Sequence, residues 1–136
     1  DETKDRHKII KKLNTENKSG LIIFSSGSTG KAKAMVHDMD NLVSVFLKKR
    51  IRKMTFMVFL MFDHIGGINT LFNCLATGAT VVIPSRREPD EVIRLIDNYK
   101  VQILPTSPTF LNLMLMSGSL DKHDTSSLRM ITYVLK

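Results

Sequence analysis

Residues 25–33 read SSGSTGKAK, which places four hydroxyl side chains, two glycines and two lysines in nine positions. The stretch directly follows the apolar run LIIF at residues 21–24, which we interpret as a buried strand. Glycines let backbone N–H groups approach phosphate oxygens closely, while hydroxyl and ammonium groups add donors and positive charge. The composition therefore predicts a loop that holds phosphate.

The spacing of the glycines excludes two common phosphate loops. A Walker loop has four residues between its glycines, followed by Lys and then Ser or Thr. Here two residues separate Gly27 from Gly30, and Ala32 follows Lys31. The dinucleotide-binding fingerprint G-x-G-x-x-G is absent from the sequence. Taken without its surroundings, the segment from Gly27 to Gly30 is also compatible with a flexible surface turn.

Apolar runs and helical periodicities alternate on both sides of this loop. We expect strands at residues 21–24, 54–61, 79–83, 101–104 and 128–135. We expect helices at residues 38–51 and 68–76, and from Pro89 and Pro108, because proline is well tolerated in the first turn. The alternation is typical of an α/β fold with a mostly parallel sheet. Such sheets bind ligands at the carboxyl ends of their strands, where we expect residues 25–33 to lie.

Composition and charge exclude several classes of protein. The 136 residues contain one cysteine, Cys74, so an internal disulfide and a cysteine-rich metal site are ruled out. Cys74 lies in an apolar stretch and is predicted to be a buried free thiol. No apolar run approaches the roughly 20 residues that span a bilayer, and the polar start does not resemble a secretory signal. We therefore expect a cytoplasmic protein without a transmembrane segment.

The net charge of +7 includes a basic cluster, KKRIRK, at residues 48–53. A basic cluster is compatible with nucleic-acid binding. Here it falls where the predicted helix 38–51 ends, and cations at that end complement the helix dipole. No aromatic residues interleave with the cluster as base stacking requires. A nucleic-acid-binding module is therefore the weakest of the functional hypotheses.

The loop resembles the signature of the adenylate-forming, or AMP-binding, enzyme superfamily, which includes acyl-CoA synthetases, luciferases and peptide-synthetase adenylation domains. That signature reads Ser/Thr-Ser-Gly-Ser/Thr-Thr-Gly-x-Pro-Lys-Gly, and this chain departs from it at Ala32 and Ala34. Further similar segments follow in order at residues 62–67 (FDHIGG), 75–84 (LATGATVVIP), 105–109 (PTSPT) and 127–129 (SLR). After Tyr133 the family continues through glycine and small residues, whereas this chain has VLK.

The resemblance implies a piece of the large N-terminal domain of such an enzyme. Residues 1–19 would form a polar helical lead-in, and residues 20–136 would form strand–helix units that carry the phosphate loop. The metal-binding acid, the ribose-binding Asp and the second-domain Lys of the family match no residue of this sequence. We therefore expect that residues 1–136 alone do not complete adenylation, and that sheet edges and apolar surface favour self-association.

The implied reaction is a two-step ligation. A carboxylic acid attacks the α-phosphate of ATP, which yields an acyl-adenylate and pyrophosphate, and a thiol of coenzyme A or a carrier protein then takes the acyl group. The residues implied to hold ATP are Ser25, Ser26, Gly27, Ser28, Thr29, Gly30 and Lys33. Mg2+ is implied by the resemblance, but no metal ligand is assigned in this sequence.

Two residues are implied to take part in the chemistry. The Lys33 ammonium would neutralise phosphate charge as pyrophosphate leaves, and His64 would line the acyl side of the site. A loop histidine hydrogen-bonded to backbone is the alternative interpretation of His64, and a turn residue is the favoured one for Asp63. An alternative function is a non-catalytic protein that retains the loop as a nucleotide or anion binder.

Overall fold

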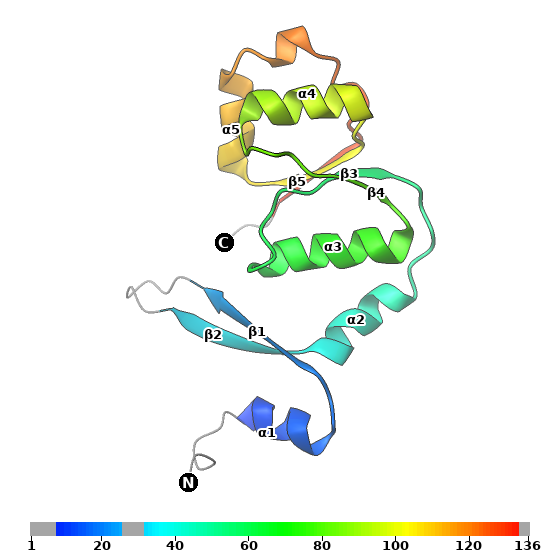
Figure 1. The fold of residues 1–136 in the computed structure, drawn as a ribbon, viewed down its shortest axis with the longest axis vertical. Coiled ribbons are helices and arrows are strands. Elements are labelled where there is room, and N and C mark those ends of the chain that lie inside the picture. Colours follow the sequence, from blue (N-terminus) through cyan, green and yellow to red (C-terminus); the bar gives the residue numbers. More distant parts are fainter. Residues whose placement is uncertain (1–7, 26–31, 134–136) are drawn as a thin grey trace.

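The computed structural model of the chain describes residues 8–25 and 32–133 (Figure 1). The helices are α1 (Lys8–Thr15), α2 (Met39–Leu47), α3 (Ile65–Thr77), α4 (Pro89–Tyr99), α5 (Pro108–Met116) and the short 3-10 helix η1 (Leu120–Lys122). The strands are β1 (Gly20–Ser25), β2 (Lys33–Asp38), β3 (Thr55–Met57), β4 (Thr80–Val82), β5 (Ile103–Thr106) and β6 (Met130–Tyr133).

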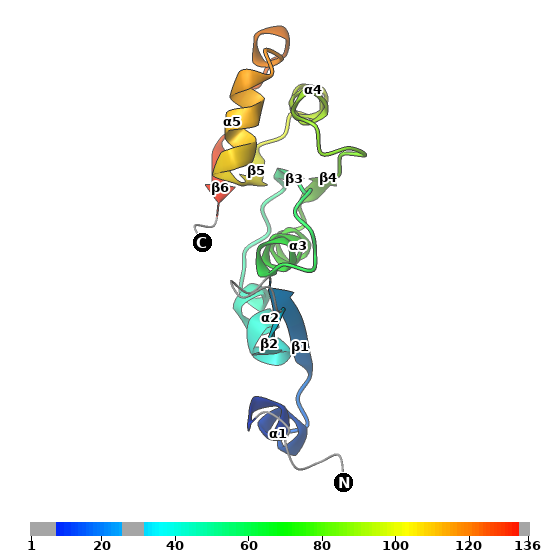
Figure 2. The ribbon, with the colours of Figure 1, turned by 90° about the vertical axis from the view of Figure 1, so that its left-hand side faces the viewer.

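Four of these strands form a parallel sheet in the order β4-β3-β5-β6. Helix α3 lies on one face of this sheet, and α4 and α5 lie together on the other face (Figures 1 and 2). Each parallel connection passes through a helix, as parallel strands require. The expected α/β fold with a mostly parallel sheet is confirmed.

The predicted phosphate loop, residues 25–33, links the two strands of a second, separate sheet. Strand β1 pairs antiparallel with β2, and Ser25 lies opposite Lys33 in the register. The prediction that residues 25–33 follow a strand of the parallel sheet is therefore wrong, because the segment joins the two strands of a hairpin. Residues 26–31 of the loop lie outside the described residues.

Residues 21–24 do form a strand, but the prediction that this strand is buried is wrong. Ile23 is buried, but Ile22 and Phe24 are 51% and 66% exposed. Alternate residues of a strand point to opposite faces. The hairpin contacts α1 and α2, and the face that carries Ile22 and Phe24 is open.

Local signals determine where the helices begin. The Asp38 carboxylate accepts a hydrogen bond from the Asn41 backbone N–H at 2.8 Å, and Ser107 Oγ accepts one from Phe110 N–H at 3.2 Å. Proline occupies the first turn of α4 and of α5, as expected. Side-chain oxygens at these cap positions satisfy N–H groups that have no partner within the helix.

Two helix boundaries differ from the sequence-based expectation. Helix α2 ends at Leu47, so the basic cluster at residues 48–53 follows the helix instead of forming its last turn. Helix α3 begins at Ile65, earlier than the expected residue 68, and ends as expected at Gly78, whose φ of 63° is left-handed. Because of this early start, the last three residues of the FDHIGG segment, 65–67, form the first turn of α3.

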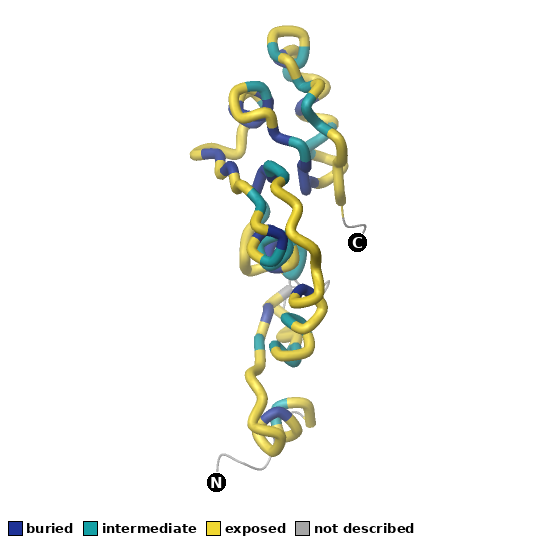
Figure 3. The backbone as a smooth tube through the Cα atoms, turned by 90° about the vertical axis from the view of Figure 1, so that its right-hand side faces the viewer, coloured by how far each residue is buried: buried dark blue, intermediate teal, exposed yellow. Residues whose placement is uncertain are grey.

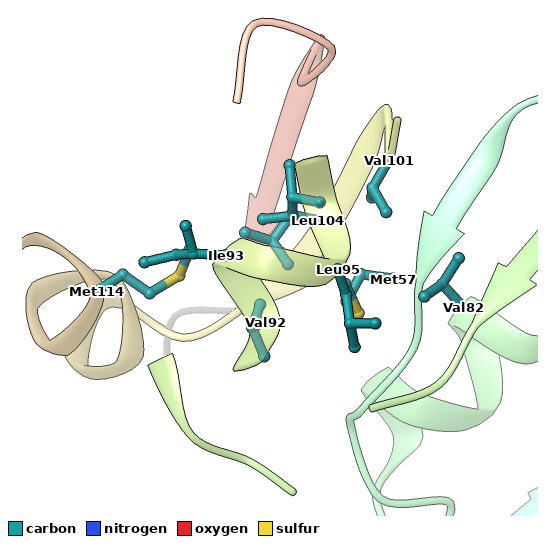
Figure 4. Packing of buried hydrophobic residues seen from close by; sticks show 9 residues of the cluster. Met57, Val82, Val92, Ile93, Leu95, Val101, Leu104 and Met114 are labelled. Carbon is teal, nitrogen blue, oxygen red and sulfur yellow. The ribbon is translucent and has the colours of Figure 1, made fainter. Parts of the chain in front are cut away.

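The main core lies between the sheet and the helices α4 and α5 (Figure 4). Its fully buried side chains are Met57, Val92, Ile93, Ile96, Val101 and Leu104. Burying one aliphatic side chain of this size stabilises a fold by about 1.5–3 kcal/mol. On α5, Met114 alone is buried, and its neighbour Leu115 is 69% exposed.

Burial is uneven along the molecule, which is elongated, with long exposed stretches on α2 and the hairpin (Figure 3). Cys74 is buried in a smaller cluster beneath α3, as predicted, and burial raises the pKa of its thiol to about 11. Among the helices of the described residues, none has the length and apolarity needed to cross a membrane.

Candidate functional site

Three adjoining pockets lie between the helices α2 and α3 and the strands of the parallel sheet. The first, which we call the carboxyl-edge pocket, has a volume of about 620 Å³ and is lined by the first turns of α3 and the ends of β5 and β6. The central pocket has a volume of about 590 Å³ and shares Thr70, Pro105 and Thr132 with the first. The third, the basic-end pocket, has a volume of about 420 Å³ and shares Phe56, Asn73 and Ile103 with the central pocket.

Because neighbouring pockets share lining residues, we treat the three as one trough. It begins at the carboxyl edge of the sheet, which is where open parallel sheets bind ligands. Its middle is mainly apolar, with Phe56, Ile103, Pro105 and Met130 among the lining residues. The mouth is also mainly apolar and carries a few polar side chains, among them His64 and Thr106, an arrangement that is typical of a small-molecule site.

His64 is the N-cap of α3 and lines the mouth of the trough. Its Nδ1 accepts a hydrogen bond from the Gly66 backbone N–H at 3.1 Å. The alternative interpretation of His64, a loop histidine bonded to backbone, is thus confirmed, and the same residue also lines a pocket. When Nδ1 accepts, the neutral imidazole carries its proton on Nε2, which is then a donor.

Gly67 holds the loop before α3 against the first turn of the helix. A Cβ atom at this position would lie 2.0 Å from the carbonyl oxygen of Met61, so no side chain fits without a backbone shift. Thr70 Oγ1 donates to the carbonyl oxygen of Gly66 at 2.8 Å within the same turns. These contacts position His64 at the mouth of the trough.

Thr106 is a lining residue that sequence reasoning missed. It is the last residue of β5 and is buried, and its Oγ1 has no hydrogen-bond partner among the described residues. A buried hydroxyl is normally paired, so an unpaired one beside a pocket is consistent with a bond to a ligand. A polar residue at the end of a predicted parallel strand is the signal that could have identified it.

The structure does not bring the two predicted catalytic residues into one described pocket. Lys33 is the first residue of β2, is exposed, and is not among the described residues that line the trough. Ser25 ends β1, and the predicted ATP-binding residues Ser26, Gly27, Ser28, Thr29 and Gly30 lie outside the described part of the chain. Their roles stay predictions.

The described residues offer no set of ligands for a metal ion. Within residues 8–25 and 32–133, no group of three or more His, Cys, Asp or Glu side chains could hold one. Asp63 lies exposed in the turn before α3, which agrees with the turn interpretation.

A family model described as AMP-binding enzyme matches residues 2–134. The chain belongs to the AMP-binding enzyme family. The match covers both the hairpin that carries the phosphate loop and the strands that form the trough, so the resemblance of the sequence motifs is confirmed for the chain as a whole.

Relatives and solved structures agree with this assignment. The AMP-binding chain is 29% identical to a 2-succinylbenzoate–CoA ligase of Bacillus pumilus over 78% of this chain and 24% of that protein. It is 28% identical to an acetyl-coenzyme A synthetase of a Shewanella species over 96% of this chain and 22% of that protein. It shares its fold with the O-succinylbenzoate coenzyme A synthetase of Bacillus subtilis, in complex with AMP, with a TM-score of 0.63 at 23% identity over 84% of this chain and 30% of that one.

The chain spans about a quarter of the length of the curated relatives that it matches. Those relatives are ligases that join acids to coenzyme A, as their names state.

Proposed function

We propose that the protein is an ATP-dependent ligase that activates a carboxylic acid as an acyl-adenylate and passes the acyl group to a thiol such as coenzyme A. The observation that carries the proposal is the trough, whose mouth lies at the carboxyl edge of the sheet, beside the N-terminus of α3, and is lined by the polar side chains of His64 and Thr106. A helix N-terminus favours anionic oxygens because of its free N–H groups and its dipole. Membership of the AMP-binding family supports the use of ATP.

In this proposal the carboxylate of the acid lies at the mouth and its apolar part lies in the central pocket. Nε2–H of His64 donates to one carboxylate oxygen and so orients the other towards the α-phosphorus of ATP. His64 is suited to this because its Nδ1 already accepts from Gly66 N–H, which fixes the ring. Orientation of this kind lowers the barrier by replacing a random encounter with a defined approach.

Adenylation requires neutralisation of charge more than proton transfer. The carboxylate oxygen forms a bond to the α-phosphorus, and the bond between that phosphorus and the pyrophosphate oxygen breaks. The loop at residues 25–30 and the Lys33 ammonium would bind the departing phosphates through N–H, hydroxyl and ammonium donors. The hairpin places Lys33 directly opposite Ser25, which brings both ends of the loop together.

Lys33 provides the test of the phosphate site. We expect Lys33→Ala, in the protein expressed from its native gene, to lower ATP affinity and acid-dependent pyrophosphate release at least tenfold, which is about 1.4 kcal/mol. Lys31→Ala is the matched control, because it removes the same charge two positions away, and we expect changes within about twofold. Titration calorimetry and a pyrophosphate assay give the two readouts.

Three results separate the hypotheses. Equal losses from Lys33→Ala and Lys31→Ala would contradict a specific role for Lys33. ATP binding without pyrophosphate release for any acid would favour a non-catalytic nucleotide binder. A salt-sensitive affinity for DNA or RNA that depends on residues 48–53 and not on Lys33 would favour a nucleic-acid module.

A further inference from the structure

The end of the trough farthest from His64 carries positive charge. Lys49, Arg50 and Arg52 line the basic-end pocket, together with apolar side chains that include Met54 and Phe56. No acidic side chain lines the basic-end pocket or the central pocket among the described residues. The three cations therefore face a pocket in which none of the lining residues that the structure describes is acidic.

Helix α3 runs along the trough, so its length gives the distance between the mouth and the basic-end pocket. The mouth is lined by residues of its first turns, from His64 to Thr70, whereas the basic-end pocket is lined by Asn73 and Thr77 near its other end. At 1.5 Å per residue, the span from His64 to Thr77 is about 20 Å. A ligand that reaches both ends must therefore be long.

Arg50 and Arg52 have no ionic partner within the described residues. Some cations elsewhere are paired: Lys100 contacts Asp97 and Asp124, and Lys18 contacts Glu16 and Asp38. Neither arginine forms an ion pair of this kind in the part of the chain that the structure describes.

Lys49 is held next to the two arginines by neutral groups. Its Nζ donates to Asn73 Oδ1 at 2.5 Å and lies 4.9 Å from the centre of the Phe46 ring. Both partners are uncharged, so these contacts place no negative charge beside the ammonium. The cluster therefore offers positive charge, two guanidinium forks and one fixed ammonium to whatever enters the basic-end pocket.

We propose that the acid bound in the trough carries a second anionic group at its far end, and that Arg50 and Arg52, assisted by Lys49, select for it. This inference rests on the proposed function and names the substrate class of the same site: a long dicarboxylate, or an acid with a comparable terminal anion. A guanidinium binds a carboxylate through two parallel hydrogen bonds. A methyl terminus at the same place would shield the arginines from water without pairing them, which disfavours monocarboxylates.

The test compares two acids that differ only at the far end. Hexadecanedioate has an extended length close to that of α3, and hexadecanoate has the same chain with one carboxylate. We measure acid-dependent pyrophosphate release by the protein expressed from its native gene. The expected kcat/KM is at least tenfold higher for the dicarboxylate.

Paired variants assign the preference to the arginines. The double variant Arg50→Gln with Arg52→Gln is expected to raise KM for hexadecanedioate about tenfold and to lower KM for hexadecanoate, because a methyl terminus then no longer covers unpaired guanidinium groups. The control is Lys48→Gln with Lys53→Gln, which removes two charges from the same segment at residues that do not line the trough. All four side chains are exposed, so neither pair removes a core contact.

The outcomes distinguish this inference from the proposed function. Equal use of both acids, or equal losses in the two double variants, overturns the inference while the ligase function stands. Release with neither acid, nor with any shorter or aromatic acid, overturns the ligase function and the inference with it. A preference for the dicarboxylate that the arginine variants alone abolish supports both.

Discussion

At the start of α3, a Cβ atom would have different effects at two adjacent glycines, Gly66 and Gly67. A Cβ atom on Gly66 would lie 3.3 Å from His64 Nδ1, whereas one on Gly67 would overlap the Met61 carbonyl group. Both glycines belong to the FDHIGG segment, and only the second packs against backbone. The sequence indicated that the FDHIGG segment resembles a family motif, but it did not indicate which of the two glycines has no room for a side chain.

Gly67→Ala tests that constraint. The substitution should lower the free energy of unfolding by about 1–3 kcal/mol, because the backbone at Met61 has to shift to admit a methyl group. Gly66→Ala is the matched control and should stay within about 1 kcal/mol of the unsubstituted protein, since alanine favours a helix more than glycine does. Urea unfolding followed by circular dichroism measures both. Equal effects of the two substitutions would show that Gly67 has no special role.

At the scale of single elements, the helices of the parallel sheet follow from their caps and periodicity. Val92, Leu95, Ile96 and Tyr99 recur at helical spacing along α4; the first three are buried, whereas Tyr99 is 59% exposed. Helix α4 continues past the region where the sheet can cover it. Periodicity identifies the face of a helix but not where its partner ends.

Ile96→Ala tests the packing of α4 against the sheet. Ile96 is fully buried, so truncation should lower the free energy of unfolding by about 2–5 kcal/mol. Leu115→Ala on α5 is the control, because that side chain is mostly exposed, and it should change stability by no more than about 0.5 kcal/mol. Thermal unfolding of the two variants gives the comparison. A larger loss from Leu115→Ala would mean that α5 buries the face that the structure leaves open.

The hairpin is the element that sequence reasoning could not predict. Residues 33–38 read KAMVHD, which is too short and too polar to stand out as a strand. Its pairing with β1 depends on contacts across a loop rather than on local propensity, and strand preferences depend strongly on context. The strands β3 and β4 are likewise shorter than their apolar runs, because pairing with neighbours defines a strand and hydrophobicity alone does not.

At the scale of the whole molecule, one ion-pair cluster connects α4 to the loop that leads into β6. Lys100 Nζ lies 2.9 Å from Asp97 Oδ1 and 3.1 Å from Asp124 Oδ2. Hydrogen bonds from Ser126, and then Lys100, lower the pKa of Asp124 to about 2, and Lys100 lowers the pKa of Asp97. Both carboxylates therefore favour the folded state while they are charged.

The sign of the pH dependence follows from these lowered pKa values. An unfolded Asp titrates near pH 3.9, so the stabilisation is complete above roughly pH 4 and is lost as the pH falls towards 2. Asp124→Asn should therefore reduce the acid-induced loss of stability between these values. Unfolding midpoints from pH 2 to pH 6 for both proteins measure it. An unchanged acid profile in Asp124→Asn would show that the cluster does not contribute.

The molecule exposes apolar side chains on α2 and α5. Val45, Leu47 and Met116 are each more than 60% exposed, and apolar surface of this kind marks sites of contact or association. Self-association through this surface stays a prediction.

The motifs predicted the family, and two of them, FDHIGG and PTSPT, contribute residues to the mouth of the trough. The basic-end pocket could not be predicted, because it joins residues 49–52 to strands far along the chain.

In the proposed function, the loop at residues 25–33 and the trough serve one adenylation reaction. Exchange of labelled pyrophosphate into ATP, catalysed by the protein expressed from its native gene, measures that reaction, because exchange requires ATP and the acid to react in one site. We expect exchange that depends on an added carboxylic acid and is lost in Lys33→Ala. Tight ATP binding with no exchange for any short, aromatic or long acid would show that the loop and the trough do not form one adenylation site.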